Sequence, residues 1–127
     1  MADKVDLLLK DYASGMLDLK INSRTKWITR QRHYEKIGGS THNKIAPQEQ
    51  RLIIIEEDSQ LQTMIDQKEI LDELMKTASK DEQDIIKYRF KYDMSWQNLG
   101  VRMMQDSSNL RKKYVKFKEK VQSLIYW

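Results

Sequence analysis

Cysteine is absent from this chain of 127 residues, and proline and glycine are scarce. Without cysteine there can be no disulfide bond, no thiolate nucleophile and no cysteine-ligated zinc. A single proline, Pro47, and four glycines leave few positions that would interrupt a helix. The alternating runs of β-branched residues that are typical of strands are also missing. The sequence therefore predicts an all-α fold.

Long apolar runs are absent too. Hydrophobic residues make up 39% of the chain and charged residues 33%, a balance that suits thin amphipathic helices. Acidic residues already occur at Asp3 and Asp6, where a signal peptide would need an apolar core, and no segment reaches membrane-spanning length. We expect a cytoplasmic protein without membrane contact.

The residue patterns of common enzymes and metal sites are missing as well. No phosphate-binding loop, dinucleotide-binding glycine pattern, nucleophile elbow or zinc-protease motif occurs. His33 and His42 are the only histidines, and neither lies in a cluster with metal-ligand spacing. The acidic run Glu56-Glu57-Asp58 is more typical of a solvated helix surface than of an acid/base pair. We therefore expect no enzyme activity, no cofactor and no metal.

Charge is distributed unevenly along the chain. Residues 1–46 hold nine basic and five acidic residues, residues 47–79 three and eight, and residues 80–127 eleven and six. A basic terminal module is the electrostatic signature of a nucleic-acid binder, because cations placed at phosphates release condensed counterions. A solvated charged surface would explain the same counts, so charge alone leaves both interpretations open.

Helical periodicity and breakers divide the chain into three segments. Segment 1–46 begins with a short helix over 3–13, bends at Ser14-Gly15, continues as a helix from about 16 to 37 and ends in the flexible linker 38–43. Segment 47–78 reads as one long acidic helix. Segment 79–127 contains a helix-turn-helix. The fold is thus predicted as N-terminal helices and a long central helix followed by a C-terminal helix-turn-helix.

Two of these helices allow alternative roles. The helix over 16–37 interleaves Trp27 and Tyr34 with basic residues, which fits either a nucleic-acid arm or a helix that packs its aromatic residues. The central helix carries an imperfect heptad pattern, typical of a dimer seam. An ordinary core helix is the alternative, with its buried face formed by Leu52, Ile55, Leu61, Ile65, Leu71 and Leu74.

The strongest local signals lie in segment 79–127. Ser79 and Glu82 form a capping box that starts one helix, and Ser95 caps a second that runs from Trp96 to about 103. Gly100 in that second helix suggests a close helix crossing. Asp106 caps a third helix, whose apolar face is formed by Leu110, Tyr114, Phe117, Val121 and Leu124.

The opposite face of the third helix carries short polar and cationic side chains at its N-terminal end, as a recognition helix does. We predict that five of its residues enter the major groove of DNA: Ser107, Ser108, Asn109, Arg111 and Lys112. Three further cations are predicted to bind phosphates: Lys113, Lys116 and Arg102.

Residues 79–120 resemble the fourth conserved region of sigma-seventy-type factors. The matching elements are Arg89-Phe90 at the end of the first helix, Ser95-Trp96-Gln97-Asn98-Leu99-Gly100, and Asp106-Ser107-Ser108-Asn109-Leu110-Arg111-Lys112. The whole layout is similar to the small late-gene transcription regulators of phages of the ArpU and RinA type. In the N-terminal part only the loose string Tyr12-x-x-Gly15-x-Leu17 matches.

This resemblance implies an activator of phage late genes that binds double-stranded DNA at a promoter in the bacterial host cytoplasm. RNA polymerase is an implied partner, with residues 1–78 as the contact surface, and a homodimer would favour a two-fold operator. The alternatives are a phage small terminase subunit, which marks DNA for packaging, and a helical adaptor that binds protein and no DNA. A ring-forming central hairpin would favour the terminase, although its helix-turn-helix would ordinarily come first in the chain.

Overall fold

The computed structural model describes residues 3–37 and 47–127, without the side chains of residues 31–37 and 47, and the predicted linker 38–43 lies outside these ranges. Within them the fold is all-α, as predicted. The elements are α1 (Lys4–Ser14), α2 (Met16–Ile37), α3 (Pro47–Glu57), α4 (Ser59–Thr77), α5 (Lys80–Ile86), the π-helical turn η1 (Lys87–Lys91), α6 (Trp96–Met103) and α7 (Ser107–Leu124). None of the described helices is long and apolar enough to span a bilayer.

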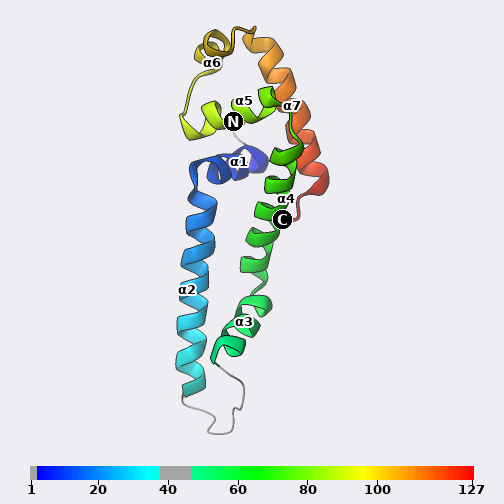
Figure 1. Cartoon of the computed structure of the whole chain (residues 1–127). Coiled ribbons are helices and arrows are strands. Elements are labelled where there is room, and N and C mark those ends of the chain that lie inside the picture. Colours follow the sequence, from blue (N-terminus) through cyan, green and yellow to red (C-terminus); the bar gives the residue numbers. More distant parts are fainter. Residues whose placement is uncertain (1–2, 38–46) are drawn as a thin grey trace.

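The helices form a head and a projecting arm (Figure 1). In the arm, α2 runs antiparallel to α3 and to the first half of α4. The head combines α1 with α5, η1, α6 and α7, and the end of α4 joins it. The predicted helix-turn-helix segment therefore shares its domain with the N-terminal helix, from which it is separated in sequence by the whole arm.

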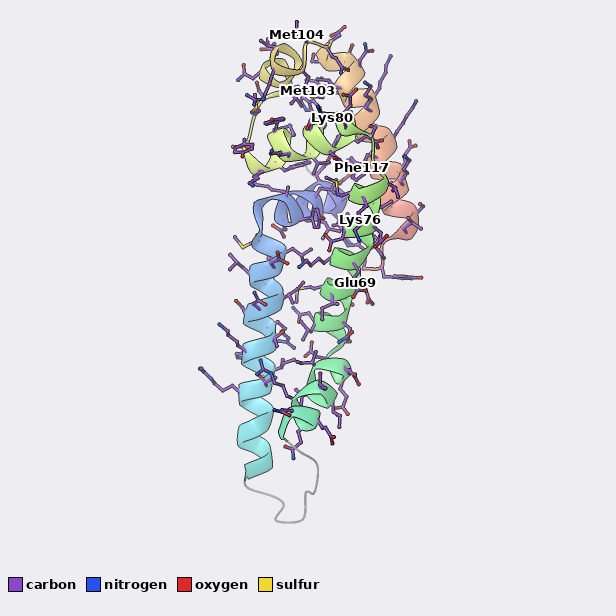
Figure 2. All side chains as sticks on the ribbon, in the orientation of Figure 1. Glu69, Lys76, Lys80, Met103, Met104 and Phe117 are labelled. Carbon is purple, nitrogen blue, oxygen red and sulfur yellow. The ribbon has the colours of Figure 1, made fainter. Side chains whose placement is uncertain are left out.

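One continuous core holds the head together. Its buried residues come from α1, α2, α4, α5, α6, α7 and the residue after α7, and Phe117 of α7 (labelled in Figure 2) is the largest fully buried side chain among them. The core consists of Val5, Leu8, Leu9, Leu17, Leu71, Ile85, Ile86, Leu99, Leu110, Tyr114, Phe117, Val121 and Ile125. At roughly 1.5 to 3 kcal/mol for each large apolar side chain, this burial is the main force that fixes α7 in place.

The chain turns between α1 and α2 at Gly15, where the bend was predicted. Asp3 and Asp6 form a reciprocal capping box at the start of α1. Gly15 ends the helix in the left-handed conformation at φ 84°, which a residue without a side chain adopts at little cost. This sharp turn sends α2 away from the head and starts the arm.

The predicted single central helix is wrong, because the chain breaks at Asp58. This residue takes an extended conformation with ψ 106°, and its carboxylate accepts a hydrogen bond from the Leu61 amide at 2.8 Å. It also forms an ion pair with Arg24 of α2 at 2.9 Å. A capped helix start and a partner across the arm together favour two helices over one.

Three side chains predicted to be buried are exposed. Leu52 is 58% exposed, and its neighbour Ile54 occupies the arm interior instead. Trp27 is 51% exposed, so the prediction that this helix packs its tryptophan is wrong; the side chain of Tyr34 is outside the described set. Leu124 is 50% exposed because the helix ends there, and Ile125, in extended conformation, turns into the core.

Candidate nucleic-acid interface

The two helices α6 and α7 and the turn between them form a tightly tied unit at the end of the molecule opposite the arm (Figure 1). Ser95 caps α6 by accepting from the Asn98 amide, and Asp106 caps α7 by accepting from the Ser108 amide. Met104 takes the left-handed conformation at φ 54° and projects into solvent at the tip (Figure 2). The structure thus confirms the predicted caps at Ser95 and Asp106 and the turn between the two helices.

Gly100 lets the turn fold back onto α6. Its carbonyl accepts from the Gln105 amide at 3.0 Å. A Cβ at position 100 would lie 2.9 Å from the Gln105 carbonyl oxygen and 3.5 Å from the Ser107 nitrogen. The small residue is thus needed where the backbone of the turn and the first residue of α7 approach α6, which agrees with the predicted close approach.

The predicted recognition face of α7 is accessible. Ser108, Asn109, Arg111, Lys112 and Lys116 are exposed, and Ser107 is partly exposed beside the turn. The buried stripe consists of Leu110, Tyr114, Phe117 and Val121. Ser108 and Lys112 lie opposite it, Asn109, Arg111 and Lys116 lie to either side of them, and Ser107 lies next to the stripe. Across the described residues, neither Lys112 nor Lys116 has an acidic side chain within ion-pair distance, so both charges are available to an anionic partner.

Arg111 is exposed and also supported by an aromatic ring. Its guanidinium carbon lies 5.7 Å from the centroid of Trp96 at the start of α6, and that of Arg89 lies 5.4 Å from the same ring. Arg89 in turn donates to the Met94 carbonyl at 3.1 Å. Contact with the ring restricts the rotamers of Arg111 while its N–H groups stay exposed, which lowers the entropy cost of binding a ligand.

Two of the predicted phosphate-binding cations have partners inside the protein. The ammonium group of Lys113 lies 2.6 Å from the Asp81 carboxylate and 2.9 Å from the Gln105 side-chain oxygen. Hydrogen bonds from Lys113 and Gln105 lower the pKa of Asp81. Arg102 lies over the ring of Tyr88 at 4.3 Å and donates to its hydroxyl at 3.2 Å. The charge of Lys113 is largely offset, whereas that of Arg102 is not.

The N-terminal helix holds α7 through a polar clasp beside the recognition face. The hydroxyl of Tyr114 donates to the carboxylate of Asp6. Lys118 pairs with Asp3 at 2.8 Å and with Asp6 at 3.2 Å. Burial, followed by the hydrogen bond to Asp6, raises the pKa of Tyr114, so it stays a neutral donor. The hydrogen bond from Lys118 lowers the pKa of Asp3 to about 2.

A cavity of about 300 Å³ lies among α1, α2, α4, α5 and η1, and four of the polar side chains that line it pair with one another. Tyr12 donates to Asp72 at 2.5 Å, and Lys68 pairs with Asp18 at 2.5 Å. In the part of the chain that the structure describes, no group of three or more metal-ligating side chains converges.

Comparison with known protein families matches nearly the whole chain to a family model. The model of the family described as "Protein of unknown function (DUF722)" matches residues 1–123. The chain belongs to this family. No curated protein and no solved structure matches it. The matched range includes both the arm and nearly all of the head.

Two features of the head were not predicted from the sequence. The first is the clasp, because nothing local to Asp6 indicates a partner more than a hundred residues away. The second is the π-helical turn η1, where a regular helix end was expected. There Tyr88 and Tyr92 stack at 5.7 Å, and Lys87 and Lys91 lie over their rings. Aromatic residues spaced by four with basic neighbours are the only signal in the sequence.

Proposed function

We propose that this protein is a sequence-specific DNA-binding regulator of transcription that places the first half of α7 in the major groove. The observation that carries the proposal is the capped unit of α6, turn and α7, whose second helix exposes polar and cationic side chains from its first residue onward. Such an arrangement fits the dimensions and the donor/acceptor pattern of the major groove.

The surroundings of each exposed side chain suggest whether it would contact a base or a phosphate. Arg111, fixed against Trp96, is suited to bidentate recognition of guanine, and Lys112 points directly away from the buried stripe. Ser107, Ser108 and Asn109 are the short polar side chains nearest the helix N-terminus, which itself attracts phosphate. Lys116, one turn further along, is suited to a phosphate contact, and Arg102 remains a candidate for another.

Lys113 is assigned a different role. Its ammonium group joins α7 to α5 through Asp81 and to the turn through Gln105. We infer that this residue sets the position of the recognition helix relative to the first helix of the head and adds little to phosphate binding.

The proposal is tested by fluorescence anisotropy with fragments of the genome that surrounds the gene and with unrelated DNA of equal length, at two salt concentrations. We expect tight, salt-sensitive binding to one fragment that lies upstream of a gene. Replacing Arg111 by alanine should cost about 1 to 3 kcal/mol on that fragment and relax the sequence preference. Replacing Lys116 should weaken binding to all sequences alike and reduce the salt slope by about one.

Lys76→Ala is the matched control, because Lys76 is an exposed lysine near the end of α4, outside the predicted DNA-contacting residues, and it pairs with Glu73 of the same helix at 3.2 Å. It should leave affinity unchanged. If no DNA is bound at low salt, or if Lys76→Ala weakens binding as much as Lys116→Ala, the proposed interface is wrong and the helical adaptor becomes the better hypothesis.

The regulatory role rests on the resemblance to phage late-gene activators of the ArpU and RinA type. We propose that the protein activates late operons, and that the exposed surface of residues 1–78 contacts RNA polymerase. Transcription in vitro with the host polymerase and a template that carries the bound fragment would test this. An increase in transcript supports activation, whereas a decrease identifies a repressor.

The second candidate function is that of a phage small terminase subunit. The observation that favours it is the helical hairpin of α2 with α3 and α4, since oligomerising hairpins accompany helix-turn-helix units in such subunits. The order of elements, with the helix-turn-helix last, favours the regulator. Binding inside a packaging gene and assembly of many copies into a ring would favour the terminase.

A further inference from the structure

The arm carries an exposed apolar pair on one of its two broad faces. Ile28 of α2 and Ile54 of α3 meet in the arm interior. Trp27 directly precedes Ile28, and Ile53 directly precedes Ile54. Each of the two side chains therefore points about 100° away from its buried neighbour, and the rotation about the helix axis has the same sense along both helices. Because the two helices are antiparallel, that shared sense puts both side chains on the same face. Trp27 is 51% exposed and Ile53 36%.

The arm by itself buries little. Within the described residues its interior cluster has three fully buried side chains, Ile28, Ile54 and Leu61. Two helices can cover each other along only one side, and isolated helical pairs gain their stability from further packing. A second pair of helices laid on the Trp27 face would complete a four-helix bundle, the usual way in which such hairpins bury their apolar residues.

Trp27 is already held in position for such a contact. The Arg24 guanidinium carbon lies 4.8 Å from the centroid of its ring, and the same guanidinium pairs with Asp58 at 2.9 Å. This chain of contacts fixes the indole at the joint between α3 and α4. An ordered, half-exposed tryptophan is the kind of residue that dominates the energetics of protein interfaces.

The two outer edges of the arm have opposite charge. Lys26 and Arg30 are exposed on α2, and Glu49 and Glu56 are exposed on α3. In the described parts of the chain none of these four side chains has an ion-pair partner. Because Ile28 and Ile54 meet, Arg30, two residues further along α2, comes level with the segment of α3 between Glu49 and Glu56.

We propose that the Trp27 face of the arm binds the same face of a second copy of this chain, with the two arms parallel. A two-fold axis along the arm places α2 of one copy over α3 of the other, so that basic edges meet acidic edges. The alternative two-fold axis, perpendicular to the arms, places α2 over α2 and α3 over α3. Like charges would then face one another across the interface, which disfavours that arrangement.

Parallel arms put both heads at the same end of the dimer, and both α7 helices with them. A dimer of this kind is suited to a two-fold operator, but its formation does not depend on DNA binding. Failure of the dimer and failure of the proposed function are therefore distinguishable, because the oligomeric state is measured on the free protein.

The first experiment is sedimentation equilibrium of the full chain across a range of protein concentrations. We expect a dimer whose dissociation constant rises about tenfold or more in Trp27→Ala, since each substitution occurs twice in a two-fold interface. Leu7→Ala is the control, because Leu7 is similarly exposed, at 54%, but lies on α1 in the head. A chain that stays monomeric throughout, a ring of many copies, or equal effects of the two variants would overturn the proposal.

A charge exchange tests the arrangement of the arms. The pair Lys26→Glu and Arg30→Glu should weaken the dimer, and so should the pair Glu49→Arg and Glu56→Arg, whereas all four substitutions together should restore affinity to within about threefold. Tightening by Arg30→Glu alone would indicate that α2 faces α2 and would overturn the parallel arrangement. So would an absence of rescue by the fourfold variant.

Spin labels measure the same arrangement directly, because the native chain has no cysteine and Glu69→Cys introduces a single labelling site on the exposed surface of α4. Position 69 lies sixteen residues beyond Ile53, roughly 24 Å along the arm at about 1.5 Å per residue. Antiparallel arms that meet at the Trp27 face would therefore separate the labels by roughly 50 Å, whereas parallel arms keep both labels at the same level and predict roughly 15–30 Å from helix spacings of about 8–10 Å. The longer distance would contradict the proposal.

Discussion

The substitution Gly100→Ala has two opposing effects on stability. It raises the helix propensity of α6, and it places a Cβ against the turn that follows this helix. The residue lies inside α6 with ordinary helical geometry, so helix propensity alone would make alanine more stable by about 1 kcal/mol. The structure predicts the opposite sign. The added Cβ would lie 2.9 Å from the Gln105 carbonyl oxygen, a backbone atom that cannot rotate away as a side chain would.

Relief of that contact requires the turn to move, and the turn is tied on both sides. The Gln105 amide donates to Gly100 at 3.0 Å, and Asp106 caps α7. Overpacking of this kind costs about 1–3 kcal/mol, so after the gain in propensity we expect a net destabilisation of about 1 kcal/mol. In a domain of this size that corresponds to a melting temperature lower by about 3–5 °C.

Urea unfolding and thermal melting of the full chain measure the effect, and DNA affinity measured in parallel should fall because the start of α7 is displaced. Asn98→Ala is the control, since position 98 is exposed on the same helix and should be neutral or slightly stabilising. If Gly100→Ala instead stabilises the protein as Asn98→Ala does, the close approach of the turn to α6 is wrong.

Three further substitutions test the contacts that position the head and the arm. Asp58→Ala should lower the unfolding free energy by about 0.5–2 kcal/mol in urea titrations, whereas Asp58→Asn, which keeps the cap, should cost less. The pKa of Asp3 is lowered to about 2 from 3.8, so its stabilisation is present above pH 3.8 and is lost as the pH falls towards 2. Asp3→Asn should therefore flatten the loss of stability between pH 5 and 2.5, and an unchanged pH profile would exclude this linkage. Lys113→Ala should weaken DNA binding less than Lys116→Ala in anisotropy titrations, because its charge is paired with a carboxylate of α5; an equal loss would contradict the positioning role.

Much of the head could be predicted because its signals are local. The capping box at Ser79, the caps at Ser95 and Asp106 and the buried stripe of α7 depend on residues three or four positions apart, and a sequence displays such spacings directly. Ser79 with Glu82, and Asp106 before α7, each act within one helical turn. The exposure of Arg111 and Lys112 could be predicted for the same reason. The apolar positions of α7 recur every three or four residues, and these two residues fall outside them.

The features that could not be predicted depend on contacts between distant segments. The apolar pattern through residues 52–55 is nearly continuous, so only the position of α2 determines that Ile54 points inward and Leu52 outward. The break at Asp58 likewise involves Arg24, which lies on another helix. The pairing of Lys113 with Asp81 is another case, since a half-exposed lysine on α7 carries no local mark of a partner on another helix.

The clasp between α1 and α7 has a consequence for how this protein is made. Asp6 leaves the ribosome more than a hundred residues before Tyr114, so the N-terminal helix must wait for that whole stretch before its partners on α7 emerge. Contacts of such long sequence separation form late and slow the folding of a domain. A chain truncated before Tyr114 therefore lacks the clasp, and its α1 has no α7 to pack against.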